Sequence, residues 1–374
     1  MNQTGSIAVG GALLLAAVAM LFWNEGRTVR TSRALDEGSR SVVSLGIDEL
    51  GAQRDGALVH STGPLTASGP IADPMLGIGF DGVMLVREVE TFQYRAKEQD
   101  PEGGSSTEAS TVEWTTRPSA SPTGEAARLP LPVGDTTLYG PDVRFGGLSV
   151  SQPLLARYRA TVPITLTDDQ LYAIAWHLDF WEVAVDGEYL YLPFGAGTPA
   201  RPQVGDYRVK LAVVPAGVVS LVGRKTGTLL EPYTASSGTS VGIIRAGALS
   251  ATAMFETAAA ENNAFSTALR FVGAGMTIGG FRLILGRLLG FLGFIPLLGG
   301  ALRLGLTAVA GALGVSMAVS VIAASWLFHR PLAALLALAV AVAMGWFVLA
   351  PATRSRRAST PPTVNAAEAT APSR

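Results

Sequence analysis

The stretch GSIAVGGALLLAAVAMLFW, residues 5–23, decides the class of this protein. It carries no charge, and a helix needs about 20 apolar residues to cross the hydrocarbon core of a bilayer. A cleavable signal peptide is the alternative, because Ala17-Val18-Ala19 fits the small-x-small cleavage pattern. No Lys or Arg precedes the stretch, and the apolar run continues to Trp23. We therefore expect a retained transmembrane anchor over residues 1–23.

Three further apolar stretches between residues 270 and 350 predict three more spans. Residues 304–328 and 331–350 are separated only by a short polar segment, which predicts a tight helical hairpin. The stretch from residue 271 ends near Arg282 and Arg287. We expect these arginines to reach the membrane surface, and an intramembrane functional charge is the alternative for Arg282. A bent interfacial connection is expected over about residues 286–303.

The composition agrees with a membrane protein and excludes several kinds of site. Hydrophobic residues make up 48% of the 374 residues and charged residues 15%, which is low for a soluble chain of this size. A net charge of −1 gives no basic field, so no nucleic-acid partner is expected. The absence of cysteine excludes disulfides and thiolate sites. The 3 histidines are too few and too scattered for a metal cluster, so no metal or cofactor is predicted.

Four spans place both ends of the chain on one side of the membrane and the large polar block on the other. The arginines within residues 354–357 favour a cytoplasmic C-terminus by the positive-inside rule, whereas those within residues 27–33 favour the opposite orientation. Charge alone leaves the orientation open. Residues 351–374, which consist mainly of Thr, Ala, Pro and Ser, are expected to form a disordered tail.

The block between the first and second spans, residues 24–247, predicts a β-rich domain. Short runs of β-branched and aromatic residues, often alternating, are bounded there by Gly, Pro or Asp. These runs are residues 57–62, 83–94, 111–116, 189–194, 207–215 and 218–224. We expect a twisted antiparallel sheet or a partly open barrel, in one unit or two subdomains. Residues 214–218 are expected to form a hairpin connection.

Two segments of the block depart from the strand pattern. Residues 97–123 are rich in Glu, Ser, Thr, Gly and Pro, which predicts a mobile loop around the strand near residue 114. Residues 248–269 interleave apolar and polar side chains at helical spacing and run almost directly into the second span. The predicted fold is therefore four transmembrane helices, one N-terminal and three C-terminal, flanking an α+β extramembrane domain that is mostly β.

The chain contains no nucleophile motif, P-loop, dinucleotide fingerprint or HExxH. Its densest cluster of chemistry-bearing side chains is WHLDFWE, residues 176–182. On a strand, His177 and Asp179 share one face, which is the arrangement that orients a catalytic imidazole or binds a metal. A structural aromatic cluster and contact of its tryptophans with lipid headgroups are the alternatives. Thr167 or Asp168, shortly before, is expected to cap a helix or turn.

Several short motifs are distributed along nearly the whole chain. NEGR follows the first span directly, EW lies on the strand within the predicted loop, VGDYRV lies near the end of the domain, and WLFHRPL lies in the terminal hairpin. With the layout of one span followed by three, these motifs resemble the TMEM43 family, also called LUMA. The residues of these motifs that we take as candidates for interaction are Asn24, Glu25, Gly26, Arg27, Glu113, Trp114, Gly205, Asp206, His329, Arg330 and Pro331.

The resemblance implies a membrane protein for which no established catalytic residues carry over. Animal members are proteins of the endoplasmic reticulum and inner nuclear membrane with the large domain in the lumen, and are thought to be scaffolds that self-associate and bind other membrane proteins. The alanine-rich, cysteine-free composition suggests a bacterial member. The corresponding location is the plasma membrane, with the domain outside the cytoplasm.

The first and last motifs invite a physical interpretation. Gly26 permits a sharp turn where the first span leaves the bilayer. Four spans bring Glu25 and Arg27 to the same membrane face as His329 and Arg330, so we expect these residues to pair. Contact of both segments with lipid headgroups is the alternative.

Three classes of function follow from these observations. The leading one is a non-enzymatic membrane scaffold that oligomerises and binds other membrane proteins and membrane lipid. The second is an enzyme acting on envelope lipid or glycan through His177, Asp179 and Glu182. The third is an oligomeric channel or transporter, against which stands the scarcity of polar side chains in the spans.

Overall fold

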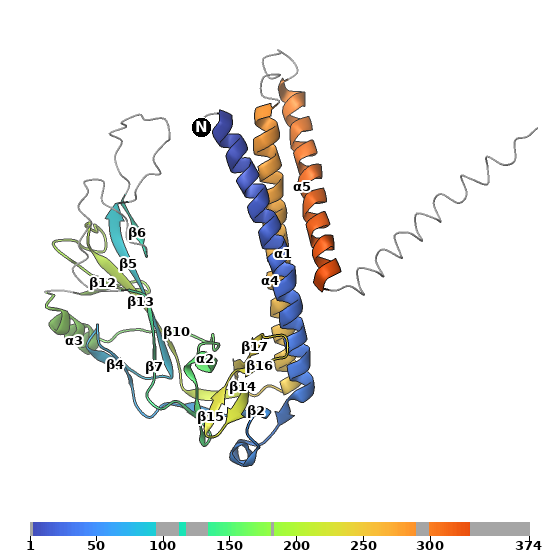
Figure 1. Cartoon of the computed structure of the whole chain (residues 1–374). Helices are drawn as coiled ribbons and strands as arrows, with labels where there is room; N and C mark the ends of the chain where they lie inside the picture. The colour runs from blue at the N-terminus through green and yellow to red at the C-terminus, as the bar shows by residue number, and fades with distance from the viewer. Residues whose placement is uncertain (1–2, 95–111, 117–133, 181–182, 289–298, 330–374) are drawn as a thin grey trace, which may run out of the picture. The chain divides into compact units, whose positions relative to one another are not determined.

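The computed structural model describes residues 3–94, 112–116, 134–180, 183–288 and 299–329 (Figure 1). The chain divides into two compact units. The first unit consists mainly of Arg30–Thr267 and contains all the described strands, and the second contains Ile7–Val29 together with the chain from Ala268 onward.

Three helices of the described chain are long and apolar enough to cross a membrane. They are α1 (Gln3–Ser41), α4 (Ala251–Leu288) and α5 (Gly299–His329). The spans predicted at residues 6–23, from 271 to about 285, and at 304–328 lie within these helices. The predicted fourth span, the predicted tail and most of the predicted interfacial connection lie outside the described residues.

Helix α1 does not end at Gly26, where the sequence predicted a sharp turn, but continues to Ser41. The extension beyond the apolar stretch persists because one side of it is buried. Ala34 and Leu35 pack in a cluster with Met254 of α4. Such tertiary packing outweighs the cost of about 1 kcal/mol for one glycine inside a helix.

Helix α4 combines two predicted elements. The amphipathic helix expected over residues 248–269 and the second span form one continuous helix, Ala251–Leu288. Its beginning packs in the first unit through Met254 and Phe255, which are 0% and 5% exposed.

The first sheet is built around β2 and β14, which pair antiparallel from Leu58 opposite Arg224 to Leu65 opposite Gly217. Because β2 also pairs with β8, the ladder β2–β8–β9–β15–β14 returns to β2 and closes a ring. The apolar side chains of this ring bury one core, which includes Leu65, Phe145 and Val219. The strands of this sheet are β1 (Val43–Ser44), β2 (Leu58–Thr66), β8 (Arg144–Phe145), β9 (Leu148–Val150), β14 (Gly217–Thr226), β15 (Leu229–Glu231) and β18 (Ile243–Ala246).

The second sheet is antiparallel throughout and has its own apolar core around Leu85, Ile174 and Val209. Helix α3 (Asp168–Leu178) packs on this core through Ile174, which is fully buried. The strands of this sheet are β5 (Met84–Tyr94), β6 (Val112–Thr115), β7 (Thr136–Tyr139), β10 (Val162–Pro163), β11 (Ala184–Asp186), β12 (Tyr189–Leu192) and β13 (Tyr207–Val214). The remaining elements are η1 (Ile47–Ala52), α2 (Gln152–Leu155), and the hairpins β3 (Ile71–Asp73) with β4 (Ile78–Phe80) and β16 (Tyr233–Thr234) with β17 (Ser240–Val241).

The six predicted strands are confirmed as β2, β5, β6, β12, β13 and β14. The predicted hairpin at residues 214–218 is wrong. Strand β13 pairs with β5 over eight residue pairs, and β14 pairs with β2 over eight. Each of these partners is a longer strand than the one that β13 or β14 would have found in the other. Pro215 and Ala216 therefore carry the chain from one sheet to the other. Of the predicted mobile loop, only the residues in and beside β6 are described.

Glycines let the helices of the second unit approach closely. A β-carbon at Gly10 of α1 would lie 2.7 Å from Ile284 and 2.9 Å from the carbonyl oxygen of Gly280. One turn earlier on α4, Thr277 Oγ1 donates to the carbonyl oxygen of Gly314 in α5 at 2.9 Å. Gly275 has no described atom within 4 Å of its β-carbon position, although it begins the GxxxG sequence of this helix.

Replacing Gly280 by valine is expected to destabilise the helix bundle by about 1–3 kcal/mol, because the new side chain overlaps Leu14 and the backbone of α1. Gly275→Val is the matched control, since it adds the same side chain to the same helix at a position where the described residues leave space. Thermal unfolding of the full chain in detergent measures both. Equal stability of the two variants would contradict the packing described.

His60 links three parts of the first unit and is 7% exposed. Its Nε2 donates to the carbonyl oxygen of Leu249 at 2.9 Å, and its Nδ1 lies 3.1 Å from Ser44 Oγ. Burial lowers the pKa of His60, and the bond to Leu249 opposes this in part. The folded protein therefore binds a proton at His60 less readily than the unfolded chain, which binds one below about pH 6.5.

The contribution of His60 to stability is therefore complete above about pH 6.5 and declines as the pH falls toward the lowered pKa of the folded protein. We expect the wild type to lose more stability than His60→Gln between pH 7 and pH 5. His177→Gln, which alters an exposed histidine, is the comparison variant. The unfolding temperatures of the variants, measured across this pH range, test this expectation. Parallel curves of unfolding temperature against pH for the wild type and His60→Gln would exclude a contribution of His60.

Candidate functional site

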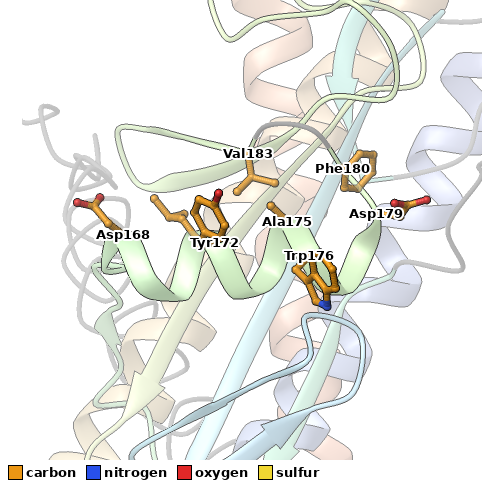
Figure 2. Close-up of a pocket in the computed structure, with 8 residues that line it drawn as sticks. Asp168, Tyr172, Ala175, Trp176, Asp179, Phe180 and Val183 are labelled. Carbon is orange, nitrogen blue, oxygen red and sulfur yellow. The ribbon is translucent and has the colours of Figure 1, made fainter.

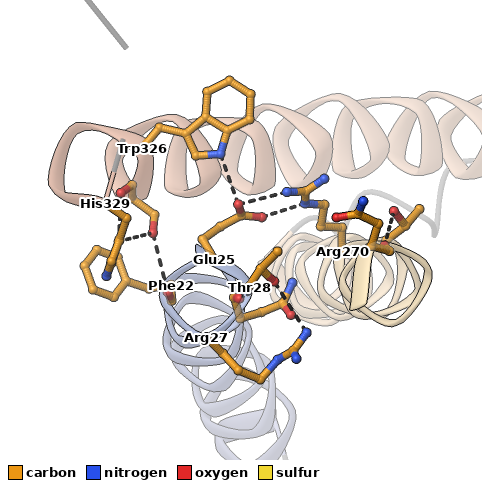
Figure 3. Close-up of polar contacts among 11 residues, drawn as sticks. Phe22, Glu25, Arg27, Thr28, Arg270, Trp326 and His329 are labelled. Atoms are coloured by element: carbon orange, nitrogen blue, oxygen red, sulfur yellow. Dashed lines mark hydrogen bonds and ion pairs between the residues drawn. The ribbon is translucent and has the colours of Figure 1, made fainter. Parts of the chain in front are cut away.

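One residue from each of the three long helices meets in a polar cluster in the second unit (Figure 3). The carboxylate of Glu25 in α1 is completely buried. It accepts two hydrogen bonds from Arg270 of α4, from Nε at 2.5 Å and from Nη2 at 2.8 Å. It accepts a third from Nε1 of Trp326 of α5 at 3.0 Å. Charge-assisted bonds of this bidentate kind are strong and directional, so they fix the relative rotation of the helices.

Further contacts extend this cluster along α1 and α5. Ser325 Oγ donates to the carbonyl oxygen of Phe22 at 3.4 Å. The ring of Phe22 lies edge-on to the rings of Phe328 and His329, with centroids 5.8 and 5.4 Å apart. The end of α5 is therefore held against the end of the apolar stretch of α1.

The structure gives Glu25 a partner that the sequence did not predict. The Nδ1 of His329 donates to the carbonyl oxygen of Ser325, one turn earlier. The cation beside Glu25 is Arg270, which the sequence reasoning missed. Arg330 and Pro331 lie outside the described residues. Asn24 is fully buried, and its carbonyl oxygen accepts from Thr28 Oγ1 at 2.7 Å, while Arg27 contacts Thr28.

The position of Arg270 in the sequence contained the missing signal. Glu25 follows the apolar stretch of α1 by two residues, and Arg270 directly precedes that of α4. Two successive spans run in opposite directions, so the end of the first and the start of the second lie at the same membrane surface. At that surface a buried carboxylate is tolerated because Arg270, which is 32% exposed, supplies the opposite charge.

Removing either member of the Glu25–Arg270 pair is expected to lower the free energy of unfolding, because the other charge loses its partner. The single substitutions Glu25→Gln and Arg270→Gln should be strongly non-additive, with a coupling energy of about 2 kcal/mol in a double-mutant cycle. The exposed pair Asp36–Arg40, with side chains 58% and 78% exposed, is the control, for which coupling should be near zero. Unfolding in detergent by increasing SDS measures both cycles. Additive effects at Glu25 and Arg270 would contradict this role.

A second set of predicted candidates gathers in the second sheet around Asp206, which is 0% exposed. Gly205 has a φ of +104°, in the region that favours glycine, and it turns the chain into β13. Asp206 then accepts from the hydroxyl of Tyr191 and from the backbone N–H groups of Phe194 at 2.8 Å and Gln203 at 2.6 Å. Burial, together with this carboxylate, raises the pKa of Tyr191, so its hydroxyl stays protonated and donates. The arrangement closes a loop and stabilises the sheet.

Trp114 also stabilises this sheet. The guanidinium of Arg208 lies 4.7 Å from the ring centroid of Trp114 and 4.3 Å from that of Tyr189, and it pairs with Glu90. Glu113 stands beside Trp114 on β6, opposite Gln93 of β5. The chemistry of these motif residues is that of a sheet held together by cation–π contacts and buried hydrogen bonds.

His177 and Asp179 are not on a strand. Thr167 caps α3, where it and Gln170 form a reciprocal capping box, and the helix continues to Leu178. Positions i and i+2 of a helix point to different sides. His177 Nε2 donates to the carbonyl oxygen of Pro74 at 3.2 Å, whereas Asp179 ends the helix with a φ of 57°.

The described residues supply no further partners for a site at His177. Glu182 lies outside the described residues, and no group of three His, Asp or Glu side chains suited to a metal occurs among those that are described. The predicted cap at Thr167 is confirmed, and it explains why this segment starts a helix rather than a strand.

The outer face of α3 forms an open pocket of about 580 Å³ (Figure 2). Asp168, Tyr172, Trp176 and Asp179 follow one another along this face at spacings of four, four and three residues, so two aromatic rings lie between two carboxylates. Tyr172 is 82% and Trp176 87% exposed. Large aromatic side chains with so much exposure are unusual on a surface that contacts only water.

Three long apolar helices with an interposed β-rich unit define an integral membrane protein with a large domain outside the bilayer. The model of the family described as Transmembrane protein 43 matches residues 90–331, and the chain belongs to this TMEM43 family. No solved structure matches the chain.

Curated relatives named Transmembrane protein 43 agree with this membership over most of the chain. The Rattus norvegicus protein is 28% identical over 88% of this chain and 86% of its own length. The Homo sapiens protein is 27% identical over 90% of this chain and 87% of its own length. A Drosophila melanogaster homologue is 26% identical over 91% and 94%.

Proposed function

We propose that this protein is a non-enzymatic membrane scaffold. Its β-rich domain binds other membrane proteins and lipid on the extracytoplasmic side, and its spans self-associate. A bacterial plasma membrane is the location that fits the alanine-rich, cysteine-free composition. The proposal rests on one observation above all, the exposed aromatic face of α3 with its flanking carboxylates.

The occupant that fits the α3 face is a protein segment with an apolar residue flanked by Lys or Arg. Tyr172 and Trp176 offer an apolar centre of the kind that supplies most of the binding energy in protein interfaces. Asp168 and Asp179 at its two ends attract basic side chains and repel the phosphates of anionic lipid. Charge complementarity therefore favours a protein over a lipid surface here.

Self-association through the spans belongs to the same proposal. The described residues leave open space beside Gly275 of α4, which lets another helix approach closely. The network of Glu25, Arg270 and Trp326 holds three helices in one arrangement, so each copy presents a constant surface to its neighbour.

The two other functions weighed from the sequence receive less support from this geometry. The enzyme hypothesis needs His177 and Asp179 to converge, and His177 is instead bonded to a backbone carbonyl. The channel hypothesis needs polar groups that line a pathway, and the buried Glu25 carboxylate is bonded to Arg270 and Trp326.

Replacing both Tyr172 and Trp176 by alanine is expected to abolish binding of the partner, because the apolar centre of the face is removed. Phe194→Ala is the matched control, since it removes a half-exposed aromatic ring elsewhere in the domain. The wild type and both variants are extracted as full chains in native lipid discs, and the proteins that accompany them are quantified by mass spectrometry.

The supporting result is a stoichiometric companion that is lost only from Tyr172→Ala/Trp176→Ala and that crosslinks to α3 through a segment of apolar and basic residues. A companion that stays with the double variant overturns the role of this face. Enrichment of lipid alone at α3 overturns the choice of a protein partner.

A further inference from the structure

The first unit contains a second pocket, of about 280 Å³, whose chemistry is opposite to that of the α3 face. Its walls come from α1, from the segment after α2, from the turn between β17 and β18, and from α4. Three arginines, Arg157, Arg159 and Arg245, line it together with one acidic residue, Glu261. The lining therefore carries a net charge of two positive units.

The single carboxylate is already neutralised within the pocket. Arg245 Nη2 lies 2.6 Å from both oxygens of Glu261. Arg157 donates instead to neutral groups of Ser240, to the carbonyl oxygen at 3.1 Å and to Oγ at 2.9 Å. Neither Arg157 nor Arg159 forms an ion pair within the described part of the chain.

Arg157 is partly removed from water, and this burial lowers the pKa of its guanidinium, although an arginine remains charged at any physiological pH. A cation that has lost part of its hydration and has no opposite charge beside it is unfavourable unless an anion completes the site. A guanidinium prefers a planar pair of oxygens such as phosphate offers. The pocket thus has the chemistry of a phosphate site.

The rest of the pocket selects the kind of phosphate compound. Hydroxyl-bearing Thr31 and Thr239 line the pocket together with the arginines, and Leu35, Val241 and Ile244, which are 7%, 3% and 1% exposed, form its apolar wall. A ligand that uses both parts is an amphiphile.

We propose that this pocket binds the phosphate of an anionic phospholipid such as phosphatidylglycerol. Arg157 and Arg159 hold the phosphate, and the apolar wall contacts the start of the acyl chains. A zwitterionic choline lipid fits less well, because its ammonium group would meet arginines and the one carboxylate is already paired. The inference deepens the proposed scaffold by naming a lipid ligand and its site, and it does not depend on the α3 face.

The test uses the full chain in a non-ionic detergent and native mass spectrometry during titration with phosphatidylglycerol, phosphatidylcholine or inorganic phosphate. The variant Arg157→Gln/Arg159→Gln should bind phosphatidylglycerol at least about tenfold more weakly than the wild type, because two charge-assisted contacts are lost. Arg54→Gln/Arg201→Gln is the matched control, with the same loss of charge in the same unit, and should bind like the wild type. Arg159→Gln alone changes an exposed side chain and gives an intermediate loss even where Arg157→Gln impairs folding.

Equal binding of phosphatidylglycerol by the wild type and the pocket variant overturns the site. Phosphatidylcholine bound as tightly as phosphatidylglycerol overturns the selection for an anionic lipid. Inorganic phosphate that displaces phosphatidylglycerol at equal concentration overturns the lipid and leaves a site for a free anion. Loss of lipid with unchanged partner binding at α3, or the reverse, separates failure of this inference from failure of the scaffold proposal.

Discussion

The bond between Glu25 and Arg270 is the interaction on which the helical unit depends. A fully buried carboxylate is unfavourable unless several donors surround it, and here the donors come from two other helices, α4 and α5. A change in the rotation or height of any one helix breaks at least one of these bonds. The close approaches at Gly10 and Gly280 supply the packing, but packing of small residues alone leaves the register of helices weakly specified. The polar cluster specifies it.

A second constraint acts on the β-rich unit, because the chain enters it through one helix and leaves it through another. Ala34 near the end of α1 and Phe255 near the start of α4 are buried in one apolar cluster with Val222 of β14. The two central strands β2 and β14 come from the beginning and the end of the domain sequence, and their pairing closes the ring of the first sheet. The second sheet is formed by the chain between them. Loss of the β2–β14 ladder would therefore detach the beginning of the domain from its end.

The sequence predicted best the features that depend on local pattern, and failed where the outcome depends on a distant partner. Apolar length identified three helices, and alternation identified six strands, since these signals lie within each segment. The neighbouring strands β13 and β14 have the sequence pattern of a hairpin, but each pairs with a longer strand elsewhere in the chain. The hypothesis of a site at His177 and Asp179 requires a strand, whereas the capping box of Thr167 and Gln170 starts a helix there. Arg270 was missed because topology, not pattern, places it beside Glu25.

The two surfaces with unbalanced chemistry in the β-rich unit have opposite character, and this contrast favours a binding role. On α3, carboxylates flank aromatic rings that water solvates poorly. In the pocket of Arg157, cations stand beside an apolar wall with their only carboxylate already paired. Elsewhere in the described domain, buried charges such as Asp73 with Arg87 and the carboxylate of Asp206 are matched by donors. These are therefore two places on the described domain at which interactions with other molecules are expected.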